Sequence, residues 1–240
     1  MSKITNVISF ILFICLSSCA VVAKDIQPKQ SSFAKVQSKV ELFIFECKEE
    51  GKGKTCATES KGIKLAFGSG MFFNYKNNVA FLSAGHVCLG PAYEWWNHLP
   101  NKSKVKTEIV LESYTGKEIK GKIKYVNIKH DLCIIETIEK AKIRNIPKIS
   151  SFKPKINEKV YSLSAPFGIF HVGVVPLLEG RYIGDQKIFS FYTIPSAPGS
   201  SGAAIFNSKN MIVGIVQRTH TAFNHITLSI KHKDLLDSLD

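Results

Sequence analysis

Arginine is scarce in this chain. Of its 32 basic residues only Arg144, Arg181 and Arg218 are arginine, although the formal net charge is +13. Proteins that read nucleic acid depend on arginine for bidentate contacts with bases and phosphates. We therefore expect no nucleic-acid partner. The scattered lysines are typical of a solvated surface, and weak attraction to an anionic membrane or an acidic substrate is the alternative.

Several other signals are also missing. The sequence has no long stretch of helical periodicity, no internal repeat, no low-complexity tract and no glycine-rich phosphate loop of the GxGxxG or Walker type. No short metal-ligand spacing supports a zinc site at the cysteines. We therefore expect neither a metal nor a cofactor.

The N-terminus is typical of an exported protein. Lys3 precedes an apolar run, Val7–Leu16, that is too short to span a bilayer comfortably. Leu16-Ser17-Ser18-Cys19 follows and resembles a bacterial lipobox. We expect a signal peptide over 1–18 and a lipid on Cys19, which places the protein on the periplasmic face of an envelope membrane or on the cell surface. The alternative is cleavage after Ala23, which leaves a soluble periplasmic or secreted protein.

Short strand-like segments separated by turns make up most of the remaining chain. After a tether over 19–35 we expect two β-rich halves, 36–146 and 147–240, and one helix over Lys233–Leu239. Fewer than forty residues follow the last motif discussed below, so we expect no separate C-terminal binding module. Such a pattern is typical of barrels or sandwiches. The expected strands are 40–45, 68–73, 79–83, 106–111, 119–126, 132–136, 159–164, 172–178, 180–183, 188–194, 203–206, 211–216 and 226–230.

Three segments carry the residue types of nucleophilic catalysis. They are Ser83-Ala84-Gly85-His86-Val87, His130-Asp131-Leu132 and Pro198-Gly199-Ser200-Ser201-Gly202-Ala203. Acyl transfer needs a hydroxyl, a base that takes its proton and a carboxylate that orients the base. The order His86, Asp131, Ser201 is one of several in which unrelated folds supply these groups.

Four cysteines remain beyond the signal region. An even number in an exported chain favours disulfides. Cys47 and Cys56 bracket a polar, glycine-containing turn and could staple a hairpin. Cys88 and Cys133 each follow a motif residue by two positions, so they approach each other if His86 and Asp131 are neighbours. Either of these two cysteines could instead be free.

With Gly68-Ser69-Gly70 and Val213-Gly214-Ile215, the motifs resemble those of the trypsin-like serine peptidases, and most closely an HtrA-type proteolytic core without a PDZ module. The resemblance extends over Phe67–Asp240. It implies an all-β fold of two packed six-stranded antiparallel β-barrels, chymotrypsin-like, with a short C-terminal helix. It also implies a serine endopeptidase whose partner is a polypeptide substrate. A non-catalytic protein-binding module on the same fold is the alternative.

The resemblance assigns roles to single residues. His86 is the general base and then the general acid, Asp131 orients it, and Ser201 attacks the scissile carbonyl. The backbone N–H groups of Gly199 and Ser201 form the oxyanion hole. Ser200 is the competing serine, but the family places the nucleophile directly before the glycine. Ala203 stands where the family usually has a second glycine.

The resemblance also places the primary substrate pocket. It puts Pro195 at one wall and Ile215, Val216 and Gln217 at another. Because no carboxylate stands at these positions, we expect an apolar or small side chain, rather than lysine or arginine, at the cleaved position. The sequence carries no signal for the oligomeric state.

Overall fold

The computed structural model describes residues 30–50, 53–95, 103–139, 143, 145–220 and 222–240, except for the side chains of 44–50, 53–61, 95 and 103. The predicted signal peptide and Cys19 lie outside these residues. The elements are η1 (Gln30–Ser32), β1 (Phe33–Glu50), β2 (Gly53–Tyr75), β3 (Asn78–Ser83), α2 (Gly85–Leu89), α3 (Ala92–Trp95), β4 (Ser103–Ser113), β5 (Glu118–Asn127), β6 (Leu132–Thr137), β7 (Lys159–Leu163), η3 (Pro166–Gly168), β8 (Leu177–Gln186), β9 (Phe189–Tyr192), β10 (Ala204–Asn207), β11 (Ile212–His220), β12 (Phe223–Ile230) and α4 (His232–Asp237).

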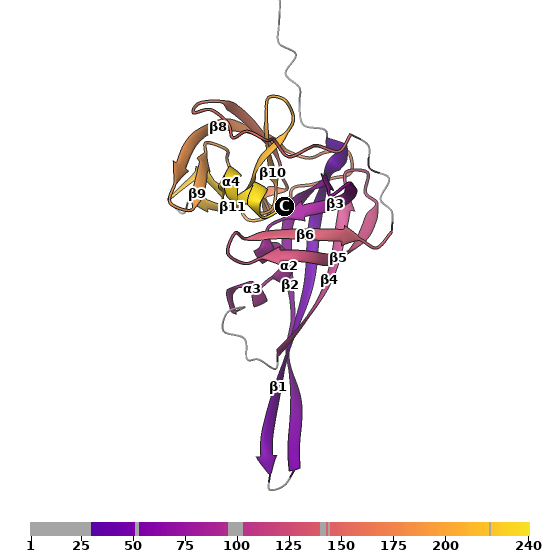
Figure 1. Cartoon of the computed structure of the whole chain (residues 1–240). Coiled ribbons are helices and arrows are strands. Elements are labelled where there is room, and N and C mark those ends of the chain that lie inside the picture. The colour runs from indigo at the N-terminus through magenta and orange to yellow at the C-terminus, as the bar shows by residue number, and fades with distance from the viewer. Residues whose placement is uncertain (1–29, 51–52, 96–102, 140–142, 144, 221) are drawn as a thin grey trace, which may run out of the picture.

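The strands form two closed barrels (Figure 1). The first has the strand order β1-β2-β3-β6-β5-β4 and the second β10-β11-β12-β9-β8-β7. Neighbouring strands in both barrels are antiparallel. The expectation of two six-stranded antiparallel barrels is therefore confirmed, and α4 supplies the expected short helix at the C-terminal end.

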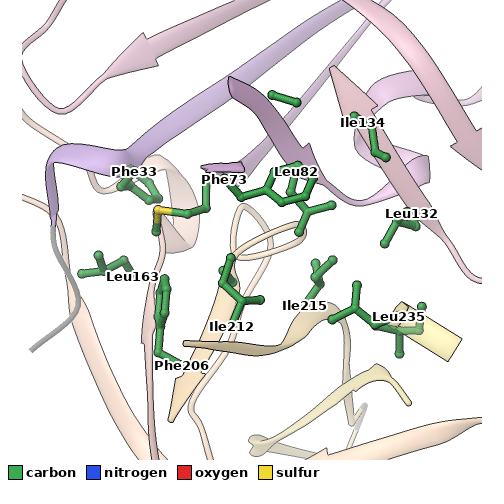
Figure 2. Close-up of a cluster of buried hydrophobic side chains, with 14 of the residues drawn as sticks. Phe33, Phe73, Leu82, Leu132, Ile134, Leu163, Phe206, Ile212, Ile215 and Leu235 are labelled. Atoms are coloured by element: carbon green, nitrogen blue, oxygen red, sulfur yellow. The ribbon is translucent and has the colours of Figure 1, made fainter. Parts of the chain in front are cut away.

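Alternating side chains explain why the two barrels pack together. Successive residues of a strand point to opposite faces. On β2, Phe72 points into the first barrel, whereas Met71 and Phe73 point outward into a cluster shared with the second barrel. That shared cluster contains Leu82, Leu132 and Ile134 from the first barrel and Leu163, Phe206, Ile212, Ile215 and Leu235 from the second (Figure 2). A separate cluster, which includes Val160, Tyr192 and Val213, fills the second barrel.

Strands β1 and β2 extend far beyond the first barrel as a hairpin (Figure 1). Strand β4 pairs with β1 only as far as Ile44, so beyond it the hairpin is a two-stranded ribbon. Cys47 and Cys56 are directly opposite partners in this ribbon, and their side chains are not described. The predicted staple at these cysteines stays a prediction.

One predicted strand is wrong. Instead of a strand over 172–178, His171 and Val174 form an isolated bridge, and β8 begins only at Leu177. Gly173 has a φ of +77°, which bends the chain there, and its N–H donates to the carbonyl of Tyr114 at 2.9 Å. The apolar residues that suggested a strand, Val172 and Val174, are largely exposed on this loop. In the described part of the chain, no helix has the length and apolar character needed to cross a membrane.

Candidate active site

His86 lies in α2, immediately after β3 ends at Ser83. The carboxylate of Asp131 contacts this histidine through both of its oxygens. One oxygen accepts the His86 backbone N–H at 2.9 Å, and the other lies 2.8 Å from Nδ1 of the ring. A carboxylate accepts hydrogen bonds only, so this contact places the ring proton on Nδ1 and leaves Nε2 unprotonated in the neutral ring. The side chain of His86 is about one-third exposed.

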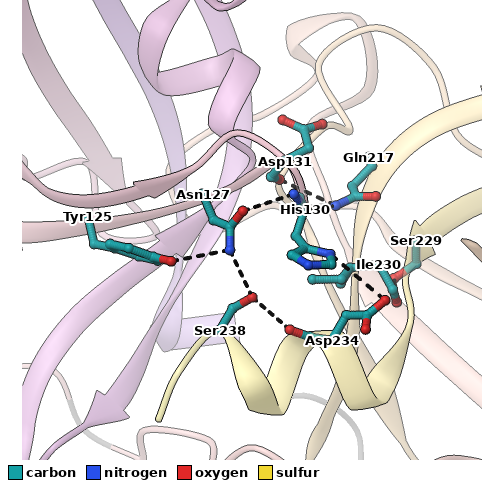
Figure 3. A network of polar contacts seen from close by, with 9 residues as sticks. All are labelled: Tyr125, Asn127, His130, Asp131, Gln217, Ser229, Ile230, Asp234 and Ser238. Atoms are coloured by element: carbon teal, nitrogen blue, oxygen red, sulfur yellow. Dashed lines mark hydrogen bonds and ion pairs between the residues drawn. The ribbon is translucent and has the colours of Figure 1, made fainter. Parts of the chain in front are cut away.

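Asp131 is presented by a strained turn. Its φ is +46°, a left-handed conformation that is uncommon outside glycine. Side chains from both barrels hold the turn: the Asn127 side chain accepts the His130 N–H at 3.1 Å, and the Gln217 amide donates to the carbonyls of His130 and Asp131 (Figure 3). Gln217 is buried and comes from β11 of the second barrel. The conformation that aims Asp131 at His86 therefore depends on contacts between the barrels.

A disulfide joins Cys88 to Cys133, with the two Cα atoms 6.5 Å apart. Both residues are fully buried. Cys88 follows His86 by two residues in α2, and Cys133 follows Asp131 by two residues in β6. The bond therefore links the two segments that bring His86 and Asp131 together.

Ser201 lies in the loop between β9 and β10, and two glycines in left-handed conformations shape this loop. Gly199 has a φ of +96° and Gly202 a φ of +87°. A Cβ on Gly202 would collide with the Ser69 carbonyl oxygen and with the Ser83 hydroxyl, so this glycine allows the loop to pack against the segment before His86. Ser201 is partly exposed, whereas Ser200 is buried and its hydroxyl accepts the Ala197 N–H at 3.3 Å. The greater exposure of Ser201 therefore favours Ser201 over Ser200 as the candidate nucleophile.

The segments of His86 and Ser201 meet at Gly68. A Cβ on Gly68 would lie 2.6 Å from a methyl of Val87 and 2.8 Å from the carbonyl oxygen of Ser201. The Ser201 carbonyl also accepts the Ser69 N–H at 2.8 Å. Among the described residues, no hydrogen bond joins the Ser201 hydroxyl to the His86 ring. Hydrogen bonds between a catalytic base and its nucleophile are often long in the absence of substrate and shorten when substrate binds.

Two backbone donors in the Ser201 loop have no acceptor within the described residues. They are the N–H groups of Gly199 and Ser201. The N–H groups between and after them are satisfied, because Ser200 donates to Ala197 and Gly202 donates to Val216. The carbonyl of Pro198 accepts the Phe167 N–H at 2.6 Å, which directs the following N–H, that of Gly199, the opposite way across the planar peptide. Both N–H groups are therefore available to donate to an oxygen of a ligand.

Two hollows flank the site. One, of about 550 Å³, is lined by His86, Tyr93, Asp131, Gln217 and Arg218, among others. The other, of about 450 Å³, lies beside Gly199 and has Phe67 and Phe167 in its wall. These two aromatic side chains are 53% and 75% exposed, which makes the second hollow an apolar surface open to solvent.

Tyr93 covers the histidine. Its ring meets that of His86 edge-on, with centroids 6.0 Å apart, and its hydroxyl donates to the Ile128 carbonyl at 2.9 Å. Burial, together with the negative charge of Asp131, raises the pKa of Tyr93 to about 12. The hydroxyl is therefore protonated at neutral pH and remains a donor to the turn that carries Asp131.

The residues of β11 that were predicted to contact the substrate have buried side chains. The side chains of Ile215 and Val216 are buried in the apolar clusters, and the amide of Gln217 is engaged with the Asp131 turn. The exposed or partly exposed side chains of this strand are Arg218, Thr219 and His220. The assignment of Ile215, Val216 and Gln217 to the substrate pocket rests on the family resemblance and stays a prediction. Pro195, at the other predicted wall, is partly exposed.

Sequence reasoning missed three contributors to the site: Ser69, Tyr93 and the supporting role of Gln217. Ser69 lies in a recognised motif, but a Gly-Ser-Gly segment does not reveal which carbonyl its hydroxyl contacts. Tyr93 and Gln217 carry no motif at all. Within the described part of the chain, no group of three His, Cys, Asp or Glu side chains could hold a metal ion.

The chain is similar to known proteins in sequence and in fold. The family model of the trypsin-like peptidase domain matches residues 68–215. Among solved structures, the serine endoprotease from Yersinia pestis superposes with a TM-score of 0.57 at 16% sequence identity. The match covers 83% of this chain and 60% of that one, so this chain spans less than two thirds of the Yersinia protein. At this identity the likeness concerns the fold. No curated protein matches the chain.

Proposed function

Because the chain belongs to the trypsin-like peptidase family, we propose that it is a serine endopeptidase that cleaves polypeptides through an acyl-enzyme on Ser201. The observation that carries the proposal is the pair of unsatisfied N–H groups at Gly199 and Ser201, beside a His86 that Asp131 holds by two contacts. A non-catalytic binding module does not require an imidazole that is oriented by a carboxylate.

The chemistry follows from these groups. The Ser201 hydroxyl oxygen attacks the scissile carbonyl carbon while Nε2 of His86 takes its proton. The carbonyl oxygen becomes an oxyanion and accepts hydrogen bonds from the N–H groups of Gly199 and Ser201. Asp131 stabilises the imidazolium, which then protonates the leaving amine as the C–N bond breaks. Water, deprotonated by His86, attacks the ester and releases Ser201.

Hydroxyl side chains beside Pro195 give this enzyme a preference for a small side chain at the cleaved position. The hydroxyl oxygen of Ser196 lies 2.8 Å from that of Thr219 and 2.8 Å from that of Thr227. Thr227 is fully buried and donates to the Ile194 carbonyl at 2.7 Å. These residues supply no carboxylate for a basic substrate side chain, and we propose that their closely packed hydroxyl groups leave room only for a small one.

We propose further that the protein is exported and anchored by a lipid on Cys19. The apolar run and the lipobox-like Leu16-Ser17-Ser18-Cys19 support this proposal. Metabolic labelling with a palmitate analogue tests it. We expect the label on the wild-type chain and none on Cys19→Ser. Label persisting on Cys19→Ser contradicts the anchor, and an unlabelled wild type supports signal cleavage after Ala23 instead.

Hydrolysis of an unstructured polypeptide by the full chain in mild detergent tests the enzymatic proposal. We expect new peptide termini to accumulate with the wild type and not with Ser201→Ala. Ser200→Ala is the matched control, because it removes the adjacent hydroxyl and should leave most activity. A correctly folded wild type that cleaves nothing supports the binding module, and full activity in Ser201→Ala assigns the nucleophile elsewhere.

A further inference from the structure

Ser69 is a fully buried hydroxyl residue of the first barrel that contacts the Ser201 loop of the second. Its hydroxyl donates to the carbonyl of Gly199 at 2.7 Å and accepts the N–H of Ala165 at 2.9 Å. A serine hydroxyl has one proton to donate and can accept in return, so both contacts are satisfied at once. The main chain of Ser69 also contacts the loop, through its N–H to the Ser201 carbonyl at 2.8 Å.

These contacts fix the two peptide planes around Gly199. The Phe167 N–H holds the carbonyl of Pro198, and the Ser69 hydroxyl holds the carbonyl of Gly199. Turning the Gly199 N–H away from the site would rotate the Pro198 carbonyl off Phe167 and disturb the neighbouring carbonyl at Ser69. Glycine itself offers little resistance to such a rotation, because it populates many backbone conformations. The resistance therefore comes from the partners of the two carbonyls.

Ser69 also ties the loop to η3. By accepting the Ala165 N–H, its hydroxyl links the residue that precedes η3 to Gly199. Phe167 of η3 supplies the other hydrogen bond to the loop. A Cβ on Gly199 would collide with the Ala165 carbonyl oxygen, so the two segments are in close contact. One side chain from β2 thus joins both segments that determine where the Gly199 N–H points.

We infer that Ser69 is a positioning residue that holds the anion-accepting conformation of the Pro198–Ser201 turn. The inference rests on the proposed peptidase function, because the turn matters to catalysis only if an oxyanion forms there. The first barrel then contributes more than His86 and Asp131. It also sets the geometry of the oxyanion donors, which belong to the second barrel.

Removing the hydroxyl should affect the transition state more than the bound substrate. Loss of an oxyanion-hole donor lowers kcat by about a hundred- to a thousandfold. Ser69→Ala keeps the donor and loosens its orientation, so we expect kcat to fall by roughly ten- to a hundredfold, within that limit. KM should change less than about twofold, because the interaction is gained only in the transition state.

The test measures three quantities on the full-length chain: kcat, KM and the affinity for a peptide aldehyde that forms a hemiacetal with the active-site serine. The hemiacetal oxygen needs the oxyanion donors, so we expect the aldehyde affinity of Ser69→Ala to fall in proportion to kcat/KM. A general loss of stability would not produce this proportionality.

Ser229→Ala is the matched control. The Ser229 hydroxyl is equally buried, accepts the Ile215 N–H at 2.9 Å and donates to the Ile230 carbonyl at 3.1 Å. Both variants lose two main-chain hydrogen bonds, so we expect similar decreases in Tm but a decrease in kcat only for Ser69→Ala. Ser69→Cys, which keeps the side-chain volume with a weaker donor, should give an intermediate kcat, and it replaces Ser69→Ala if the alanine variant does not fold.

Unchanged kcat and aldehyde affinity in a folded Ser69 variant would overturn the inference while leaving the peptidase proposal intact. An equal loss of kcat in Ser229→Ala would also overturn it, since the effect would then be one of general stability. An inactive wild type would instead overturn the proposed function on which the inference rests.

Discussion

Replacing Gln217 with methionine tests how the active site depends on contact between the two barrels. Methionine keeps most of the side-chain volume but cannot donate to the carbonyls of His130 and Asp131. Leaving buried polar groups without their donor costs about 1–3 kcal/mol. The hydrogen bonds of Gln217 also offset the left-handed conformation of Asp131, which costs roughly 1–2 kcal/mol for a residue with a side chain.

The structure therefore predicts two effects of Gln217→Met. A loss of about 1–3 kcal/mol lowers Tm by roughly 2–12 °C in a protein of this size. The turn also relaxes, and the Asp131 carboxylate moves off the His86 ring. Because a displacement of about 1 Å at a catalytic group can cost roughly a hundredfold in rate, we expect kcat to fall by about that factor with KM little changed.

The assay combines steady-state kinetics on a peptide ester, thermal unfolding and proton NMR of the imidazole. In the wild type we expect a far-downfield resonance from the His86 Nδ1 proton, which lies against Asp131, and we expect Gln217→Met to lose it. Asn207→Leu is the control, because it also removes a buried side-chain amide with two main-chain partners. The Asn207 side chain accepts the N–H groups of Lys209 and Met211 in the turn between β10 and β11, so its loss should lower Tm and leave the His86 resonance in place. A folded Gln217→Met with wild-type kcat and an intact resonance refutes the reasoning.

Three further predictions follow from single features. Replacing both Cys88 and Cys133 with serine opens a loop with a sequence separation of 45, so we expect a loss of about 4 kcal/mol in the free energy of unfolding, measured by urea denaturation; a loss below about 1 kcal/mol would contradict a stabilising role. Thr219→Gly removes a hydroxyl beside Ser196 and should raise kcat/KM for peptides with a large side chain at the cleaved position relative to alanine; an unchanged ratio would exclude Thr219 from the pocket. Burial lowers the pKa of His232, and the carbonyl of Ser150 and the charge of Asp185 only partly oppose this. The unfolded chain therefore binds a proton at this histidine more readily than the folded chain does. The contribution of neutral His232 to the free energy of unfolding is fully present above about pH 6.5 and decreases as the pH falls below it. His232→Gln should flatten that part of the Tm-against-pH curve, and an identical curve in the variant would refute the assignment.

The fold class was predictable from short strand-like segments separated by turns, together with the resemblance to the trypsin-like peptidases. The consecutive apolar residues Met71, Phe72 and Phe73 are typical of a strand that is buried on both faces. The order His86, Asp131, Ser201 is that of the family with two barrels. What alternation does not specify is the register of a strand against its neighbours. For that reason the sequence did not show that the side chains of Ile215 and Val216 lie in the core.

The supporting contacts of the site were beyond sequence reasoning for a different reason. Ser69 is 130 residues from Gly199, and Gln217 is 87 residues from His130. Neither spacing follows any local periodicity, since each contact exists only once both barrels have closed and packed together. The Cys88–Cys133 disulfide could be anticipated because each cysteine lies at the same short offset from a motif residue.

The most direct test of the central claim is covalent labelling of the full chain with a fluorophosphonate, followed by peptide mapping. An activated serine beside an oxyanion hole reacts with this probe, whereas an ordinary surface serine does not. We predict one adduct on Ser201, none on Ser200, and loss of labelling in His86→Ala. A folded wild-type chain that stays unlabelled, or one labelled at Ser200, would contradict the proposed acyl-transfer site.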